Sequence, residues 1–449
     1  EIGVRLVGSE MCIRDRCNDL SCMGLRAYVY PVRDFNFLDF QSRSHEYEHA
    51  RLKVLLKLLN HECDVAIACV DAAAQLTVPR NVLEQSVIEF EEGRELSLEK
   101  ATKALTLLGY ERFDAVEGSG QFSLRGGILD FFMPDSDYPV RCEFWGDEIT
   151  DLSYFDIETQ RRFKKADKIT LSPSTEIVIE DRAALADKIE HKAKLLRSKN
   201  SAKAKEKLFS EAELIRSGAM IANADKFINQ IYDKPESLFD YLDRNTLVFA
   251  SEFTAIQERG KSMDFISNET LMQGFEDGTL CRGFDRFALT FNECTEFLQS
   301  HGTIVLENFV HGSMPIKLSE IISFSTKQLS AWGGSYKQLK EDVDGLFTPE
   351  SKGVIFAGTE RAAKNLCDTF NADGINAVYS EGADKISKGE LLVMQGALSA
   401  GFEYPSQKFF AITYSQVSYR PEKSKKKKKK TGKEIYSLSE LAPGDYVVH

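Results

Sequence analysis

Arginine and tryptophan side chains mark one face of a predicted β-strand. In Pro139–Trp145 (PVRCEFW) the two-residue strand period places Arg141 and Trp145 on one face, opposite an apolar face. Arg125 ends an earlier alternating run, QFSLR. Guanidinium groups pair with carboxylates and tryptophan fills apolar pockets, so these residues are typical of a protein-docking face. The alternative is that Trp145 packs under a neighbouring loop and both arginines are ordinary surface cations.

Three antiparallel strands are predicted to position these side chains, over Gln121–Phe132, Pro139–Trp145 and Glu148–Phe155. Turn residues separate them, MPDSD after the first strand and GD after the second. Gly126-Gly127 interrupts the first strand, as a bulge or a close backbone approach would. Because the first turn leaves the register open, the pattern does not determine whether the two arginines point to the same side of the sheet.

A short histidine motif lies nearer the N-terminus. His45–His49 (HEYEH) matches H-E-x-x-H, in which two histidines bind zinc and the glutamate is a general base. A catalytic zinc site needs a third protein ligand, which we cannot identify. We therefore favour a polar, solvated first turn of an amphipathic helix over Ser42–Leu59, and we predict no metal site.

A second motif resembles part of a phosphate-binding loop. Gly260-Lys261-Ser262 ends like G-x-x-x-x-G-K-S, but the position of the first glycine holds Ala255. The preceding SEFTAIQER is typical of a helix, whereas a phosphate loop follows a strand through a glycine-rich turn. Without those backbone amides no phosphate cradle forms, so we predict no nucleotide site here.

Composition limits the class of protein. A chain of 449 residues with 43% hydrophobic residues is expected to form two to four domains. Its 57 basic and 69 acidic residues give a net charge of −12, which argues against a protein that coats nucleic acid. Nine scattered cysteines without a C-x-x-C pair predict a reduced, cytoplasmic compartment, without disulfides or a cysteine zinc site. No apolar run approaches ~18 residues, so no membrane span is expected.

Alternating strand and helix patterns surround the predicted sheet. Ser97 and Gly109 are expected to begin and end one helix. Buried strands are predicted at 64–70 and 246–250, and further strands at 25–31, 353–357 and 390–394. Helices are predicted at 182–214, 335–343 and 359–371. The run EKSKKKKKKTGKE (422–434) predicts a disordered linker, with a nucleic-acid-binding tail as the alternative.

Three strings carry a family resemblance: GQFSLRGGILDFF (120–132), YPVRCEFWGDEI (138–149) and FDIETQR (155–161). They resemble the inserted domain shared by UvrB and the transcription-repair coupling factor (Mfd) family. The resemblance implies that this sheet binds the damage-recognition protein UvrA. It puts Arg125 and Arg141 at the two motif arginines and Trp145 at the interface aromatic, where phenylalanine is more familiar. PGDYVVH (443–449) resembles the start of the family's RNA polymerase-binding domain.

The implied fold class is α/β multidomain. A degenerate helicase-like (UvrB-like) α/β domain would carry an inserted small antiparallel-sheet α+β domain and be followed by a small α/β domain. We expect the first domain at 17–83 and 174–317, the UvrA-binding insertion at 84–173, the small domain at 318–420, a lysine-rich linker at 421–435 and the start of the RNA polymerase-interacting domain at 436–449. Residues 1–16 resemble a non-native artefact and are left out of the predicted fold.

The implied function is recruitment. The N-terminal fragment of such a factor would bind UvrA and bring nucleotide excision repair to stalled RNA polymerase. In the full-length family a motor that uses ATP and magnesium acts on double-stranded DNA, and a C-terminal domain masks the UvrA-binding surface. The motor's motifs are absent from this sequence, so we expect no enzyme activity and no cofactor for it. The lack of a long apolar run predicts no membrane partner.

Two alternatives stay open at this point. The first is a truncated UvrB-type helicase-like repair subunit, which helicase motifs directly after the small sheet would favour. The second is a non-catalytic module that binds DNA through Lys425–Lys430, which a steep salt dependence of DNA binding would favour.

Overall fold

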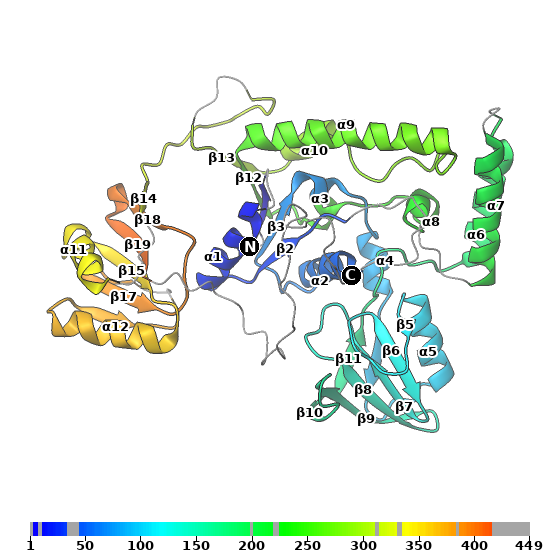
Figure 1. The fold of residues 1–449 in the computed structure, drawn as a ribbon, viewed down its shortest axis with the longest axis horizontal. Helices are drawn as coiled ribbons and strands as arrows, with labels where there is room; N and C mark the ends of the chain where they lie inside the picture. Colours follow the sequence, from blue (N-terminus) through cyan, green and yellow to red (C-terminus); the bar gives the residue numbers. More distant parts are fainter. Residues whose placement is uncertain are drawn as a thin grey trace, which may run out of the picture.

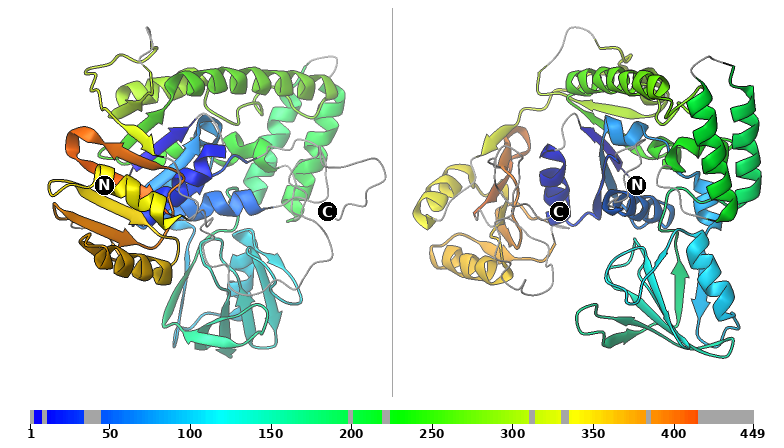
Figure 2. Two further views of the ribbon diagram at one scale, coloured as in Figure 1. Left: turned by 60° about the vertical axis from the view of Figure 1, so that its left-hand side comes forward. Right: turned by 45° about the vertical axis from the view of Figure 1, so that its right-hand side comes forward.

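The computed structural model describes residues 3–7, 11–33, 45–197, 201–218, 224–309, 314–329, 335–382 and 386–414 (Figure 1). In this part of the chain, two α/β units flank a connecting segment, and a smaller sheet unit extends from the first of them (Figures 1 and 2). The mixed α/β class predicted for the chain is confirmed. The predicted linker and the RNA polymerase-interacting start (421–449) lie outside the described residues.

A five-stranded parallel sheet organises the first unit, in the order β13-β12-β1-β3-β2. From one edge to the other the strands are Thr303–Leu306, Leu247–Ser251, Gly3–Val7, Val65–Cys69 and Ala27–Tyr30. Parallel strands are buried by the helices that connect them, and β3 (VAIAC) is almost wholly buried, as its apolar run predicts. The helices of this unit are α1 Met11–Cys22, α2 Glu46–Leu59, α3 Val70–Ala74, α4 Arg80–Gln85, α9 Phe253–Asp277 and α10 Phe291–Ser300.

The position of β1 corrects one expectation. The predicted fold omits residues 1–16, yet Gly3–Val7 forms the middle strand and pairs in parallel with both β3 and β12. The physical reason is that β3 and β12 belong to distant parts of the chain and need a strand between them to complete one hydrogen-bonded sheet.

A helical hairpin forms the far end of the first unit (Figure 1). The lysine-rich stretch predicted as helical over 182–214 forms two helices, α6 Arg182–Leu195 and α7 Ser201–Ser217. They pack through a small apolar core that includes Ile189 and Leu208 and is completed by Phe227, Cys281 and Phe284. Short helical turns lead back to the sheet: Ala224–Phe227 (η1), Ile228–Ile231 (α8) and Leu238–Tyr241 (η2).

The chain passes from the first unit to the smaller unit and back through a pair of antiparallel strands, β4 Ile88–Glu91 and β11 Lys168–Leu171. Its six-stranded sheet has the order β10-β9-β8-β7-β6-β5. The strands are Arg162–Lys165, Glu148–Phe155, Val140–Trp145, Ile128–Phe131, Gln121–Arg125 and Glu111–Arg112. Helix α5, Leu98–Leu107, packs on the apolar face of the sheet. Its predicted ends are confirmed, because the Ser97 side chain accepts a hydrogen bond from the Lys100 amide and Gly109 has a φ of +88°.

The single strand predicted over Gln121–Phe132 is wrong, because it is a hairpin of β6 and β7. Gly126 and Gly127 form its turn, with φ of +62° at Gly126. The predicted close backbone approach is present at Gly127, where a Cβ atom would lie 2.8 Å from the carbonyl oxygen of Phe144. Two consecutive glycines therefore reverse the chain here, rather than bulging it.

The last unit is a second α/β sheet, in the order β14-β18-β19-β15-β17-β16. Its strands are Lys327–Leu329, Gly401–Tyr404, Phe409–Thr413, Lys352–Phe356, Glu390–Met394 and Ala377–Tyr379. Helices α11 (Tyr336–Leu346) and α12 (Glu360–Ala372) share its main core, and Pro405–Gln407 (η3) is a short turn. The strands and helices predicted for this segment are confirmed.

Candidate docking site on the inserted sheet

The structure brings the three predicted residues to one face of the inserted sheet. Cys142 and Phe144 of β8 point into the apolar core, so Arg141 and Trp145 lie on the opposite face, as predicted. A register shift near Glu143 sets Phe144 opposite Ile149 and leaves Thr150 of β9 as the extra residue. The alternation along β8 therefore continues unbroken to Trp145.

Asp130 of β7 joins the two arginines. Its side chain is 1% exposed, and cross-strand pairing sets it directly opposite Arg141. Arg141 donates from Nε to Asp130 Oδ1 at 2.7 Å and from Nη2 to Oδ2 at 2.8 Å. Arg125 donates from Nη2 to the same Oδ2 at 2.9 Å. Both arginines therefore point to one side of the sheet, which the sequence pattern left open.

Arg141 is enclosed by its own protein. Its side chain is only 13% exposed, and its guanidinium carbon lies 4.4 Å from the centre of the Phe155 ring. The Gln160 carbonyl and side-chain oxygens accept from Arg141 Nη1 at 3.1 Å and from Nη2 at 3.2 Å. The hydrogen bonds to Asp130 raise the pKa of Arg141. Arg141 is thus a fixed cation under a loop.

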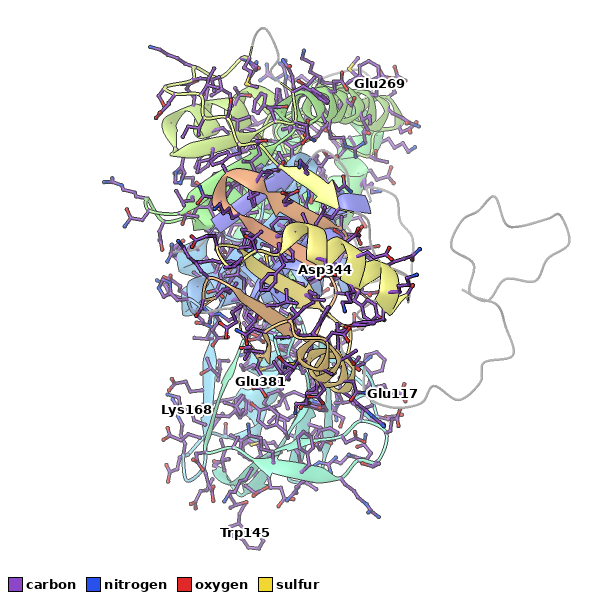
Figure 3. All side chains as sticks on the ribbon, turned by 90° about the vertical axis from the view of Figure 1, so that its left-hand side faces the viewer. Glu117, Trp145, Lys168, Glu269, Asp344 and Glu381 are labelled. Atoms are coloured by element: carbon purple, nitrogen blue, oxygen red, sulfur yellow. The ribbon has the colours of Figure 1, made fainter. Side chains whose placement is uncertain are left out.

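Arg125 and Trp145 are open to solvent. The Arg125 side chain is 50% exposed, and Trp145 is 82% exposed. The two residues end strands β6 and β8, next to the hairpin turns at Gly126-Gly127 and Gly146-Asp147. Figure 3 shows Trp145 at the tip of the inserted unit, pointing away from the rest of the protein. The alternative that Trp145 packs under a loop is wrong.

A second group of charges lies beside the first on the same face. Arg162 of β10 donates from Nη1 to Asp151 at 3.0 Å and also pairs with Glu143. Three arginines and three carboxylates thus alternate across this face: Arg125, Arg141 and Arg162 with Asp130, Glu143 and Asp151. The face is therefore patterned rather than broadly basic, and Arg125 is the most accessible of these three arginines.

Sequence reasoning missed Asp130, Gln160 and Phe155 as parts of this site. One signal was present, because Asp130 lies within the apolar run ILDFF and a buried carboxylate needs cationic or hydrogen-bonding partners. Gln160 carried no such signal. It reaches Arg141 only because the chain after β9 turns back with φ of +57° at Gln160.

The histidine motif lies at the junction between the first unit and the insertion. His45 Nδ1 lies 2.9 Å from Glu48 Oε2, and burial lowers the pKa of His49, which packs against Gly120. Glu48 is buried and accepts hydrogen bonds from the Glu176 amide and the Thr175 hydroxyl. The predicted solvated first turn is therefore wrong at Glu48 and His49, because this turn packs against two other segments.

The phosphate-loop motif lies inside a helix. Gly260-Lys261-Ser262 falls in the first half of α9, which runs from Phe253 to Asp277. A Cβ atom at Gly260 would overlap the ring of Phe291 in α10. The predicted helix is confirmed, and this glycine serves the close approach of two helices rather than a phosphate cradle.

Comparison with known proteins identifies the inserted unit. Residues 88–177 match the family described as the UvrB interaction domain. The chain is 28% identical over 434 residues to the transcription-repair-coupling factor of Bacillus subtilis (strain 168). It is 26% identical over 445 residues to that of Staphylococcus epidermidis (strain RP62A). Each match covers 94% of this chain. The resemblance to the transcription-repair-coupling factors is confirmed.

The match extends well beyond the inserted sheet, since 94% of the chain aligns with these coupling factors. The chain spans 36% of the length of these curated transcription-repair-coupling factors. Among the helices in the described ranges, none is both long and apolar enough to cross a membrane.

Proposed function

We propose that this chain is a recruitment module of a transcription-repair coupling factor and that its inserted sheet binds UvrA. The family match over residues 88–177 and the coupling-factor relatives support a role in transcription-coupled repair. The observation that carries the proposal is the pair of exposed side chains, Arg125 and Trp145, on one face of that domain. An exposed arginine and an exposed tryptophan on the same face are residue types typical of an interface hot spot.

The chemistry indicates the kind of surface that this face recognises. Arg125 would pair with a carboxylate of UvrA, and Trp145 would enter an apolar pocket beside it. Because the charges on this face alternate, a partner with complementary charges in the right register is preferred over a uniformly acidic one.

Titration of the full chain against purified UvrA tests the proposal. We expect Arg125→Ala and Trp145→Ala each to weaken binding by ~1–3 kcal/mol, the range of interface anchors. Arg112→Ala and Phe163→Ala are matched controls, because both side chains are exposed on the same sheet but at strands β5 and β10. Unchanged affinity in the first pair, with circular dichroism showing intact folding, would contradict the assignment of the site.

We further propose that the chain neither hydrolyses ATP nor translocates on DNA, and that RNA polymerase and double-stranded DNA are partners of the longer protein. The helical environment of Gly260-Lys261-Ser262 supports the first statement, because a phosphate loop needs a strand running into a glycine-rich turn. An ATPase assay with double-stranded DNA checks it, and turnover above the buffer rate would contradict it.

A further inference from the structure

Arg125 and Arg141 differ in how many of their hydrogen-bond donors remain available to a partner. A guanidinium carries five N–H donors. Arg141 already directs four of them to Asp130 and Gln160, and its flat face lies on Phe155. Arg125 directs a single hydrogen bond, from Nη2, to Asp130 within the part of the chain that the structure describes.

Asp130 is the centre of this arrangement. It is buried, so a partner cannot touch it, and both of its oxygens are occupied by arginines. The bidentate contact with Arg141 satisfies most of its hydrogen-bonding capacity. Arg125 shares only Oδ2 and keeps half of its side chain in solvent.

We infer that Arg141 is a positioning residue, clamped by Asp130 and Gln160, and that Arg125 and Trp145 make the direct contacts with an acidic, apolar-lined patch of the partner. Arg141 neutralises Asp130 and so leaves Arg125 available. Without Arg141, the buried carboxylate draws Arg125 inward, because an unpaired buried charge is costly. The inference rests on the proposed UvrA binding. It separates Arg141, which positions, from Arg125 and Trp145, which contact the partner.

A double variant separates positioning from contact. We expect Arg141→Met to weaken UvrA binding about tenfold, since Arg125 then turns to Asp130. Methionine keeps an apolar side chain over Phe155. Adding Asp130→Asn removes the buried charge that recruits Arg125, so the double variant should return to within about threefold of the wild-type affinity.

The outcomes differ for the two roles. If Arg141 touches UvrA directly, the double variant stays as weak as Arg141→Met, and the inference is overturned. Adding Arg125→Ala to the double variant should abolish the recovery. Gln160→Gly is a milder second variant, because glycine accepts the φ of +57° while losing the side-chain acceptor. It should weaken binding a few-fold, and no change would count against the clamp.

A measurement on the free chain keeps this test independent of UvrA. In spectra of arginine Nε–H groups, the Arg141 signal should exchange with water at least tenfold more slowly than that of Arg125, because Asp130 accepts from Arg141 Nε. Asp130→Asn should accelerate the exchange of Arg141. Equal exchange of the two arginines would overturn the clamp. Failure of the folded wild-type chain to bind UvrA would instead refute the proposed function.

Discussion

Gly260 shows how one missing side chain decides the packing of two helices. It lies within α9, where glycine lowers helix stability by roughly 1 kcal/mol relative to alanine. The ring of Phe291 in α10 fills the space that a Cβ atom would occupy. The close helix crossing therefore outweighs the cost to helix propensity.

Helix propensity alone predicts that replacing Gly260 by alanine stabilises the protein, whereas its packing predicts destabilisation. We expect Gly260→Ala to lower the free energy of unfolding by about 1–3 kcal/mol, because the buried Phe291 ring must move. Gly345→Ala in α11 is the matched control, since no atom lies within 4 Å of a Cβ there. It should raise stability by roughly 0.5–1 kcal/mol. Urea unfolding followed by circular dichroism measures the change in the free energy of unfolding for both variants. A more stable Gly260→Ala protein would contradict the close packing of Gly260 against Phe291.

At the scale of elements, buried ion pairs tie together segments on either side of the insertion. Arg51 of α2 donates from Nε to Glu176 Oε1 at 2.7 Å, and both side chains are fully buried. Thr77 donates its hydroxyl to Glu176 Oε2 at 2.6 Å, and the Arg51 guanidinium lies 4.2 Å from the centre of the Tyr30 ring. This network fixes the point at which the chain returns from the inserted sheet.

Removal of one partner from this network should be costly. We expect Arg51→Ala to destabilise the protein by ~3–5 kcal/mol, because Glu176 would keep a buried charge without its main cation. Lys53→Ala is the control on the same helix, since its partner Asp137 is solvent-exposed and such pairs contribute about 0–1 kcal/mol. Equal effects in thermal melts would show that the network carries little of the stability.

Glu48 makes part of the stability of this junction dependent on pH. Burial by itself raises the pKa of this carboxyl group, but the hydrogen bond from His45 and the charge of Arg33 bring its pKa well below the usual range. A folded-state pKa below the unfolded value of about 4.3 stabilises the fold above that pH. This contribution is lost as the pH falls through the folded-state pKa.

The Glu48→Gln variant tests this dependence. It should be less stable than the wild type at pH 7, and the difference in the free energy of unfolding should shrink as the pH falls below about 4. Urea titrations at a series of pH values measure that difference. A constant difference across the acid range would show that the Glu48 charge contributes nothing.

At the scale of the whole molecule, α1 of the first unit contacts the last unit. Asp19 accepts hydrogen bonds from the Ser399 amide at 2.7 Å and from its hydroxyl at 2.6 Å. Cys22 packs against Gly396 and donates to the Ala397 carbonyl at 3.5 Å. The two α/β units therefore meet at the loop after β17, while the inserted sheet extends away from both (Figure 2).

Reactivity of Cys22 reports on this contact. Burial raises the pKa of the Cys22 thiol, so alkylation at neutral pH should be slow. We expect Asp19→Ala to speed alkylation of Cys22 several-fold by releasing the Ser399 loop. Because the Asp19 charge itself also raises that pKa, Asp19→Asn is the control, which removes the charge but keeps an acceptor. Equal rates of Cys22 alkylation in the two variants would show that the faster reaction comes from loss of the Asp19 charge alone.

Much of the docking face could be predicted from local sequence. The two-residue period of PVRCEFW puts Arg141 and Trp145 on one face whatever lies beside the strand. Ser97 and Gly109 likewise bound their helix through interactions with the adjacent backbone. These predictions hold because each depends on a few consecutive residues.

Tertiary structure decided what those side chains can do. The pairing of Asp130 with both Arg125 and Arg141 requires the β6–β7 hairpin turn and the β7–β8 register, neither of which follows from alternation alone. Gln160 reaches Arg141 from nineteen residues away through a turn that no local pattern indicated. The sequence by itself determined that Arg141 and Trp145 share one face of their strand, and the β6–β7–β8 pairing added Arg125 to that face. Only the fold decided that Arg141 is enclosed and Arg125 is free to reach outward, because burial and hydrogen-bond partners are set by chain segments far apart in sequence.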